Sequence, residues 1–305
     1  MLAAMMVAAA LALPQDQGPP SPRAPGADPV VRLEDIVVDA RRLEDAAREF
    51  VDEVAHPVQR RGMARWHDGV CVGVANLQPE LAQHLIDRVS DVARDIGLTS
   101  SEPPCHPTIL IIATTDAAAF TEQFIAMRPA LFRPGGSGMD HGRAALNRFR
   151  TTDAAVRWWS ISQPTDSDTG QAAVRMPGEA APYTTIRGVS RLSSQYRQDL
   201  KRTFVIVDVD RLGEVNLSQL GDYIAMVSLA QIDPEADTSG FESVLNVFDS
   251  PSSVSGLSSW DRAYLEGLYG ASWYRINQTS QVRAISDNIA REYRGAQAAE
   301  PAETE

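Results

Sequence analysis

The stretch LSQLGDYIAMVSLAQI, which runs from Leu217 to Ile232, decides the expected fold. Leu217, Leu220, Ile224 and Val227 repeat at helical spacing and form an apolar stripe. The neighbouring residues that widen this stripe are Tyr223, Met226 and Ala230. A helix that is apolar almost all round is buried, so this segment predicts a helix in the protein core.

Helices and strands alternate in the chain before this segment. A first helix is indicated by the apolar positions Leu43, Ala47, Phe50 and Val54. The next expected elements are a strand at Val70–Val74, a helix with a buried stripe from Leu81 to Ile96, a strand at Thr108–Ile112 and a helix at Ala117–Met127. This alternation predicts an α+β fold, in which helices pack on a mixed β-sheet.

Two further strands are expected between residues 150 and 210. Ala155–Ser162 is one of them, and its adjacent Trp158 and Trp159 are predicted to face opposite sides of the sheet. The segments that follow are a polar loop at Gln163–Ala181, a return through Tyr183–Arg187, a polar connector at Ser190–Lys201 and a strand at Thr203–Asp210. The chain therefore offers enough apolar strands for a multi-stranded sheet.

Composition limits the possible partners. The chain has 305 residues, of which 44% are hydrophobic, and its formal net charge is −12. A chain of this charge lacks the overall basic surface that binds nucleic-acid phosphates or anionic membranes. We expect no nucleic-acid partner, and no stretch reaches the roughly 20 apolar residues that a transmembrane helix needs.

The N-terminus indicates export. Residues 1–13 are almost wholly Ala, Leu, Met and Val, which is typical of a signal-peptide core, although no Lys or Arg precedes them. Residues 14–34 are predicted to be a disordered linker, 35–293 a single α+β domain and 294–305 a disordered tail. A last helix inside the domain is marked by Val282, Ile285, Ile289 and Tyr293. A periplasmic or secreted location follows from this organisation.

Cys71 and Cys105 are the two cysteines of the chain. Disulfides persist in oxidising compartments, so export makes a bridge between them plausible. Their spacing does not match the C-x-x-C pattern of zinc sites, and Cys105 beside His106 is not a catalytic dyad, because adjacent residues of an extended segment point to opposite sides. The sequence alone leaves the pairing open.

Four segments follow one another between about Ser193 and Tyr269: RTFVIVDVD, LSQLGDYIAMVSLAQID, SVLNVFDS and GLSSWDRAYLEGLYG. Their order resembles that of an uncharacterised bacterial secreted family, a domain of unknown function with a zincin-like, metallopeptidase-type layout, and the resemblance extends more loosely back to Cys71. The last segment is the most specific, and its matching positions are Leu257, Asp261, Leu265, Leu268 and Tyr269. Asp261 also has a structural interpretation, because Ser258 three residues earlier forms a helix-capping pattern with it. The resemblance implies a zincin-like arrangement of these elements.

The metal motif of that layout is absent. When the helix is overlaid on a peptidase helix, the ligand positions fall near Tyr223 and Val227 and the general base near Ile224. None of these side chains binds zinc or activates water. We therefore expect no metal, no cofactor and no catalytic residue in a degenerate, noncatalytic domain. The polar side chains of the helix that could still line a cleft are Asp222, Tyr223 and Gln231.

Other polar residues complete the set of candidates. Asp140 and His141 end a glycine-rich segment, RPGGSGMDHGR, and Asp208 and Asp210 stand where a strand ends. The spacing of the two aspartates predicts carboxylates on one side of an extended chain, where they could bind a cation or act as acid and base, or simply cap the strand. The five histidines are His56, His67, His84, His106 and His141; they show no ligand spacing, and those worth checking for convergence are His67, His106 and His141.

Two functional hypotheses follow. The first is a noncatalytic protein of the cell envelope that binds a peptide, a glycan or a protein partner in a cleft inherited from a peptidase-like ancestor. The second is a hydrolase whose site is assembled from scattered residues such as Asp140, His141, Asp208 and Asp210. An enzyme requires several of these groups to converge around one pocket.

Overall fold

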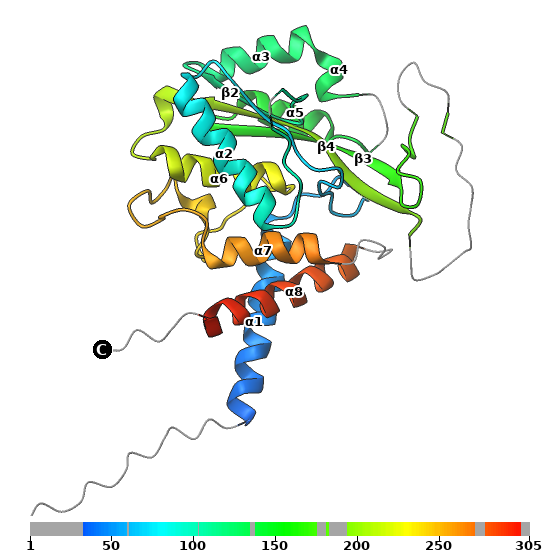
Figure 1. The fold of residues 1–305 in the computed structure, drawn as a ribbon, viewed down its shortest axis with the longest axis vertical. Coiled ribbons are helices and arrows are strands. Elements are labelled where there is room, and N and C mark those ends of the chain that lie inside the picture. The colour runs from blue at the N-terminus through cyan, green and yellow to red at the C-terminus, as the bar shows by residue number, and fades with distance from the viewer. Residues whose placement is uncertain are drawn as a thin grey trace, which may run out of the picture.

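The computed structural model describes residues 33–59, 61–102, 104–134, 138–175, 181–182, 194–271 and 278–299 (Figure 1). The helices are α1 Leu33–Val54, α2 Pro79–Asp95, α3 Ala117–Met127, α4 Pro129–Phe132, α5 Gly142–Thr151, α6 Leu217–Leu229, α7 Ser259–Gly270 and α8 Gln278–Ala299, with short 3-10 turns at Val209–Arg211 and Val244–Asn246. The strands are β1 Val72–Ala75, β2 Ile109–Thr114, β3 Val156–Asp166 and β4 Tyr196–Asp208.

The four strands form one mixed sheet in the order β1-β2-β4-β3. β1, β2 and β4 run parallel, whereas β3 is antiparallel to β4 and forms one edge. The predicted α+β fold with a mixed sheet is confirmed. β2 lies inside the sheet, which is why its sequence reads as a continuous apolar run.

Helices cover both faces of the sheet and enclose two hydrophobic cores. The larger core joins one face to α1, α2, α6, α7 and α8, and the smaller core joins the other face to α3, α4 and α5 (Figure 1). Trp158 packs against the larger core and Trp159 belongs to the smaller one. The prediction that these two side chains face opposite sides of the sheet is confirmed.

Helix α6 is the core helix that its sequence predicts. Every residue from Gln219 to Leu229 is buried. Its first turn is fixed by a capping box, in which the Asn216 side chain accepts from the Gln219 backbone and the Gln219 side chain accepts from the Asn216 backbone. The same device starts α7, where Ser258 and Asp261 cap the helix as expected.

Both strands of the β3–β4 hairpin are longer than the sequence predicts. β3 continues past Ser162 to Asp166, and β4 begins at Tyr196, inside the stretch expected to be a polar connector. Buried polar side chains account for the error: Arg197 Nε donates to Asp199 Oδ1 at 2.8 Å, so the pair satisfies itself within the strand. The polar residues at the start of β4 therefore belong to a buried strand, although their sequence predicts a connector.

The first and last helices of the structure are both longer than the sequence predicts. α1 begins at Leu33, and α8 continues past Tyr293 to Ala299, so part of the tail expected to be disordered is helical. Residues 1–32, which contain the predicted signal segment and most of the linker, lie outside the described residues, as does the return of the hairpin loop expected at Tyr183–Arg187. Among the helices that are described, none is long and apolar enough to cross a membrane.

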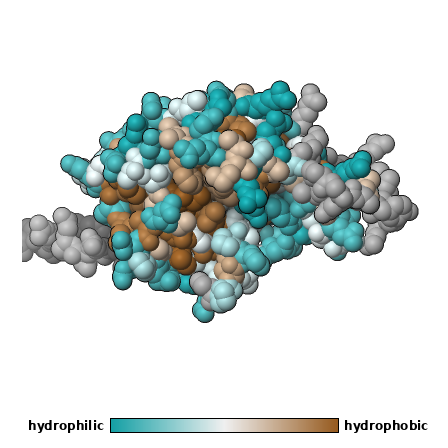
Figure 2. All heavy atoms as spheres, turned by 90° about the horizontal axis from the view of Figure 1, so that it is seen from above, coloured by the Kyte–Doolittle hydropathy of each residue, from teal (hydrophilic) through white to brown (hydrophobic). Residues whose placement is uncertain are grey.

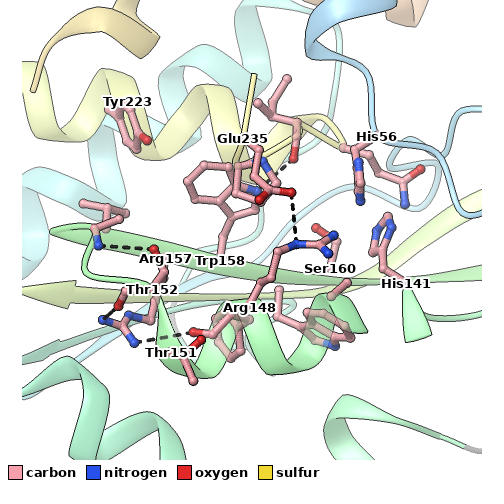
Figure 3. A pocket seen from close by; sticks show the side chains of 18 residues that line it. His56, His141, Arg148, Thr151, Thr152, Arg157, Trp158, Ser160, Tyr223 and Glu235 are labelled. Carbon is pink, nitrogen blue, oxygen red and sulfur yellow. Dashed lines mark hydrogen bonds and ion pairs between the residues drawn. The ribbon is translucent and has the colours of Figure 1, made fainter. Parts of the chain in front are cut away.

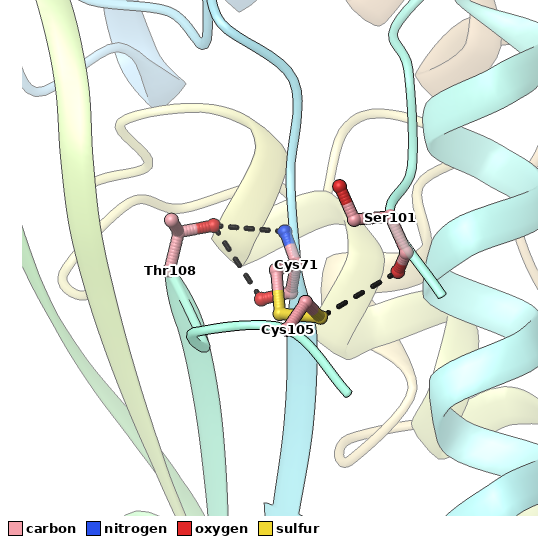
Figure 4. Close-up of a disulfide and its surroundings, with 4 residues drawn as sticks. All are labelled: Cys71, Ser101, Cys105 and Thr108. Atoms are coloured by element: carbon pink, nitrogen blue, oxygen red, sulfur yellow. Dashed lines mark hydrogen bonds between the residues drawn. A yellow bond between two sulfur atoms is a disulfide. The ribbon is translucent and has the colours of Figure 1, made fainter. Parts of the chain in front are cut away.

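Cys71 and Cys105 form a disulfide, with their Cα atoms 6.2 Å apart (Figure 4). The bridge ties the residue before β1 to the loop before β2, and Thr108 reinforces this junction because its Oγ1 accepts from the Cys71 backbone N–H at 3.0 Å. The two cysteines, whose pairing the sequence left open, are therefore bonded to each other.

One end of the molecule carries apolar residues among hydrophilic ones (Figure 2). Helix α3 lies at this end in Figure 1 and buries only Ala117 and Thr121 completely, while Met127 is 70% exposed.

Candidate functional site

A pocket of about 260 Å³ lies at the edge of β3 that pairs with no other strand of the described sheet (Figure 3). Helix α5 forms one wall, and the segment after α6 forms the opposite wall together with the residue that follows α1. Lining residues that matter for the site are His56, His141, Arg148, Val156, Trp158, Ser160, Tyr223, Gln231, Ile232, Pro234 and Glu235. The pocket therefore collects residues from five separate parts of the chain.

Aromatic side chains give the pocket rigid apolar walls. The Trp158 ring meets Tyr223 edge-on with centroids 6.1 Å apart, and its Nε1 donates to the Ile232 carbonyl at 3.1 Å. Trp159 Nε1 donates to the Phe132 carbonyl at 2.9 Å. Because both indoles are anchored by hydrogen bonds, their positions are set before any ligand binds.

The floor of the pocket is the unpaired edge of β3. The Asp208 N–H donates to the Ala155 carbonyl at 2.8 Å, so alternation along an antiparallel pair turns the backbone groups of Val156, Trp158 and Ser160 away from β4. The next residue of this series, Ser162, donates outward to the Met139 carbonyl at 3.0 Å. Within the part of the chain that the structure describes, no segment pairs with the outward groups of the other three.

A histidine pair and an aspartate stand at one end of the pocket. His56 Nδ1 lies 2.9 Å from Asp233 Oδ2, and the His56 ring stacks on His141 with centroids 4.5 Å apart. Burial, helped by the neighbouring His56, lowers the pKa of His141 to about 4. Burial alone would raise the pKa of Asp233, but its hydrogen bonds with the His56 ring and the Glu235 backbone N–H, together with the nearby positive charge of Arg148, lower it overall. At neutral pH, His141 is therefore neutral and Asp233 is ionised.

An ion pair joins the two walls of the pocket. Arg148 Nε of α5 lies 3.0 Å from Glu235 Oε2, beyond the end of α6 (Figure 3). Deeper in, Gln231 Oε1 accepts from the Ala64 N–H at 2.9 Å, whereas its buried Nε2 has no partner among the described residues. The pocket wall thus contains a polar donor that the described chain does not satisfy.

The structure brings some of the sequence-predicted cleft residues together. Tyr223, Gln231 and His141 line the pocket, and burial raises the pKa of the Tyr223 hydroxyl. Asp140 lines the adjoining cavity with His141, and its Oδ1 accepts from the Gly142 N–H at 2.7 Å. Of the peptidase-overlay positions, only Tyr223 reaches the pocket, because Ile224 and Val227 are completely buried.

Asp222 lies elsewhere, on the opposite side of α6. Its carboxylate pairs with Arg88 of α2 and accepts from the Leu257 N–H at 3.0 Å. With only 4% of its surface exposed, Asp222 joins three segments of the core. Asp222 therefore does not line the pocket with its neighbour Tyr223, because adjacent residues on a helix differ in direction by about 100°.

Asp208 and Asp210 are not neighbours on one side of a strand. β4 ends at Asp208, and the chain then turns into a 3-10 helix, which carries Asp210 to an exposed position. Asp208 is buried, and its Oδ2 accepts from the first N–H of α3, that of Ala117, at 3.1 Å. The capping interpretation therefore fits Asp208, and the paired-carboxylate interpretation is wrong.

Sequence reasoning missed His56, Asp233, Arg148 and Glu235. Asp233 and Glu235 share one segment, but His56 and Arg148 come from parts of the chain far from it, so no local spacing connects the set. His67 and His106 are exposed and do not line the pocket, and His56 is the histidine that meets His141. The only available signal was weak: His56 precedes Pro57 where a predicted helix ends, and Asp233 precedes Pro234 in the same way.

No protein-family model matches this chain, and no curated protein or solved structure is significantly similar to it.

Proposed function

We propose that this chain is an exported, noncatalytic binding protein with a zincin-like layout, and that it holds an extended peptide segment of another protein along β3. The observation that carries the proposal is the edge of β3. Three of its residues, Val156, Trp158 and Ser160, present outward backbone groups at a pocket with aromatic walls. The chemical complement of such an edge is another extended backbone.

The groove continues beyond the pocket on both sides, which suits a long ligand. The cavity at the His56 and His141 end measures about 930 Å³ and shares these two residues with the pocket. The cavity at the start of β3 measures about 670 Å³ and shares Val156, Trp158 and Tyr223 with it. An extended ligand gains about 3.3 Å per residue, so a short peptide can run along this groove.

A free peptide fits this edge better than a second copy of the chain. Val156 and Ser160 are only 1% and 4% exposed, and Val156 also belongs to the larger core, so this edge lies below the surrounding surface. Two recessed edges cannot approach each other, whereas a single extended strand can enter the groove. A glycan would leave the regular alternation of backbone donors and acceptors unused.

The disulfide supports the exported location, since oxidising compartments preserve such bonds.

The test compares Ser160→Pro with Ser160→Ala. Proline removes the outward N–H of residue 160 without removing a β4 hydrogen bond, and the alanine variant keeps that N–H. We expect peptides selected by the wild-type protein from a displayed random library to bind Ser160→Ala normally and Ser160→Pro about tenfold more weakly or worse. Equal binding by both variants would contradict the proposal.

A second proline pair keeps the test valid if Ser160→Pro does not fold. Val156 is the first residue of β3, a position that tolerates proline, so Val156→Pro and Val156→Ala make the same comparison. Circular dichroism and a thermal melt establish which variants are folded.

A hydrolase is the second candidate, and one specific observation favours it. Asp233 orients His56 through its Nδ1, which is how a histidine is prepared to act as a general base. The residues of the original hydrolase hypothesis do not gather around one pocket, since Asp208 and Asp210 line neither this pocket nor the histidine cavity. Cleavage of a bound peptide, detected by mass spectrometry and lost in His56→Gln, would favour the enzyme over the binding protein.

A further inference from the structure

The cavity at the start of β3 has an acidic lining. The carboxylates on it are those of Asp153, Glu214, Asp233, Asp237 and Asp249, and its one guanidinium is that of Arg211. Arg211 is already engaged, at 3.6 Å from Asp153 and 3.7 Å from Asp208. We call this cavity, of about 670 Å³, the acidic hollow. Its lining carries a net negative charge at neutral pH.

Three of these carboxylates, those of Glu214, Asp237 and Asp249, have no ion pair among the described residues, and of the three only Asp237 is held by hydrogen bonds. Asp233 is hydrogen-bonded to His56, and the Asp237 carboxylate accepts from the Ser239 backbone and hydroxyl. Glu214 and Asp249 are exposed, and no ion pair to either is found among the described residues. These two are the groups that a ligand cation could neutralise.

Aromatic side chains stand beside these acids. Tyr223 meets Phe248 edge-on with centroids 5.0 Å apart, and both line the hollow together with Trp158. Aromatic rings next to carboxylates suit a Lys or Arg side chain, because the rings cover its apolar stem and attract its charge. An acidic or neutral ligand would leave Glu214 and Asp249 uncompensated.

The backbone of β3 connects the hollow to the peptide groove. Val156 lines both cavities, and its outward N–H and C=O face away from β4. A ligand residue that pairs with Val156 therefore has its backbone at the border of the acidic hollow. Side chains alternate along an extended strand, so one side chain near this point can enter the hollow.

We propose that the acidic hollow binds a Lys or Arg side chain of the extended peptide that pairs with β3. This inference rests on the proposed function and specifies the class of partner: a protein segment that is extended and basic at one position. The charge of the hollow selects the ligand, and the edge of β3 holds it.

The experiment measures the contribution of charge separately from backbone pairing. A displayed random library is selected on the wild-type protein, and the affinity of the enriched peptides is then measured for the double variant Glu214→Gln/Asp249→Asn. Glu80→Gln/Glu102→Gln is the matched control, because it removes the same charge from exposed positions outside the hollow. All four positions are exposed, so the variants should remain folded.

Support for the inference has three parts. The enriched peptides share a Lys or Arg at one position, the hollow variant binds them about tenfold more weakly, and the control variant binds them as the wild type does. A peptide with Gln at that position should bind the wild type and the hollow variant equally well. The loss should also shrink in high salt, because the acids are exposed.

Other outcomes overturn the inference that the acidic hollow binds a basic side chain. Enriched peptides without a shared basic residue, or equal affinity for the hollow variant, refute the acidic hollow as a basic-residue site while leaving strand pairing intact. No enrichment above the level seen with Ser160→Pro refutes both proposals. A wild-type dimer that Ser160→Pro converts to a monomer would identify the occupant as a second copy of the chain, and this too would refute a basic partner.

Discussion

Replacement of Asp222 should destabilise the protein and leave its groove unchanged. The carboxylate is 4% exposed and accepts from the Leu257 N–H at 3.0 Å. Asp222→Ala leaves this buried N–H without a partner, which costs about 1–3 kcal/mol. It also removes the ion pair with Arg88, whose side chain is 30% exposed, so this part adds less than about 1 kcal/mol. The expected total is about 1–4 kcal/mol.

Urea unfolding at pH 7, followed by circular dichroism, measures this loss. Asp222→Asn keeps an acceptor for Leu257 and should lose only about 1 kcal/mol. Arg88→Met preserves most of the side-chain volume but leaves the buried Asp222 carboxylate without its cation, so it should lose about 1–3 kcal/mol. The reasoning is refuted if Asp222→Ala unfolds at the wild-type urea concentration while losing peptide binding, since that result would assign Asp222 to the cleft.

Two further predictions concern the disulfide and the histidine pair. The loop-entropy relation for a sequence separation of 34 residues predicts that Cys71→Ser/Cys105→Ser loses about 3.8 kcal/mol of unfolding free energy, and urea unfolding should show no further loss on adding a reductant to this variant. His141 has a pKa of about 4 in the folded protein, below its unfolded value of 6.5, so its contribution is complete above pH 6.5 and is lost as the pH falls toward 4. The loss should reach at most about 3 kcal/mol. His141→Gln should remove this part of the pH dependence, and an unchanged pH profile in that variant would contradict the assignment.

Local sequence patterns were sufficient for most of the regular structure. The apolar spacing of α6, the continuous apolar run of β2 and the capping residues of α7 act within a few residues, so their consequences can be derived from the sequence. The start of β4 could not be predicted from the sequence. Charged residues such as Arg197 and Asp199 are typical of the surface, and only the structure shows that they form a hydrogen-bonded pair in a buried strand.

The candidate site was only partly predictable for a related reason. Tyr223 and Gln231 follow from their place on or just after the core helix, and both line the pocket. Asp222, adjacent to Tyr223, points into the core, and a difference of one residue on a helix changes direction by about 100°. The packing of α2 against α6 decides that Asp222 points into the core and that Tyr223 points into the pocket.

The sequence by itself determined that this chain contains a buried helix and apolar strands for a sheet on which the helix packs, because apolar periodicity is a local property. It also showed that this helix, Leu217–Leu229, contains no histidine and no cysteine. Only the tertiary structure decided that β3 is an edge strand, that the disulfide forms and that His56, His141 and Asp233 meet. These features join residues distant in sequence, and their contacts are set by how the layers pack rather than by any pattern along the chain.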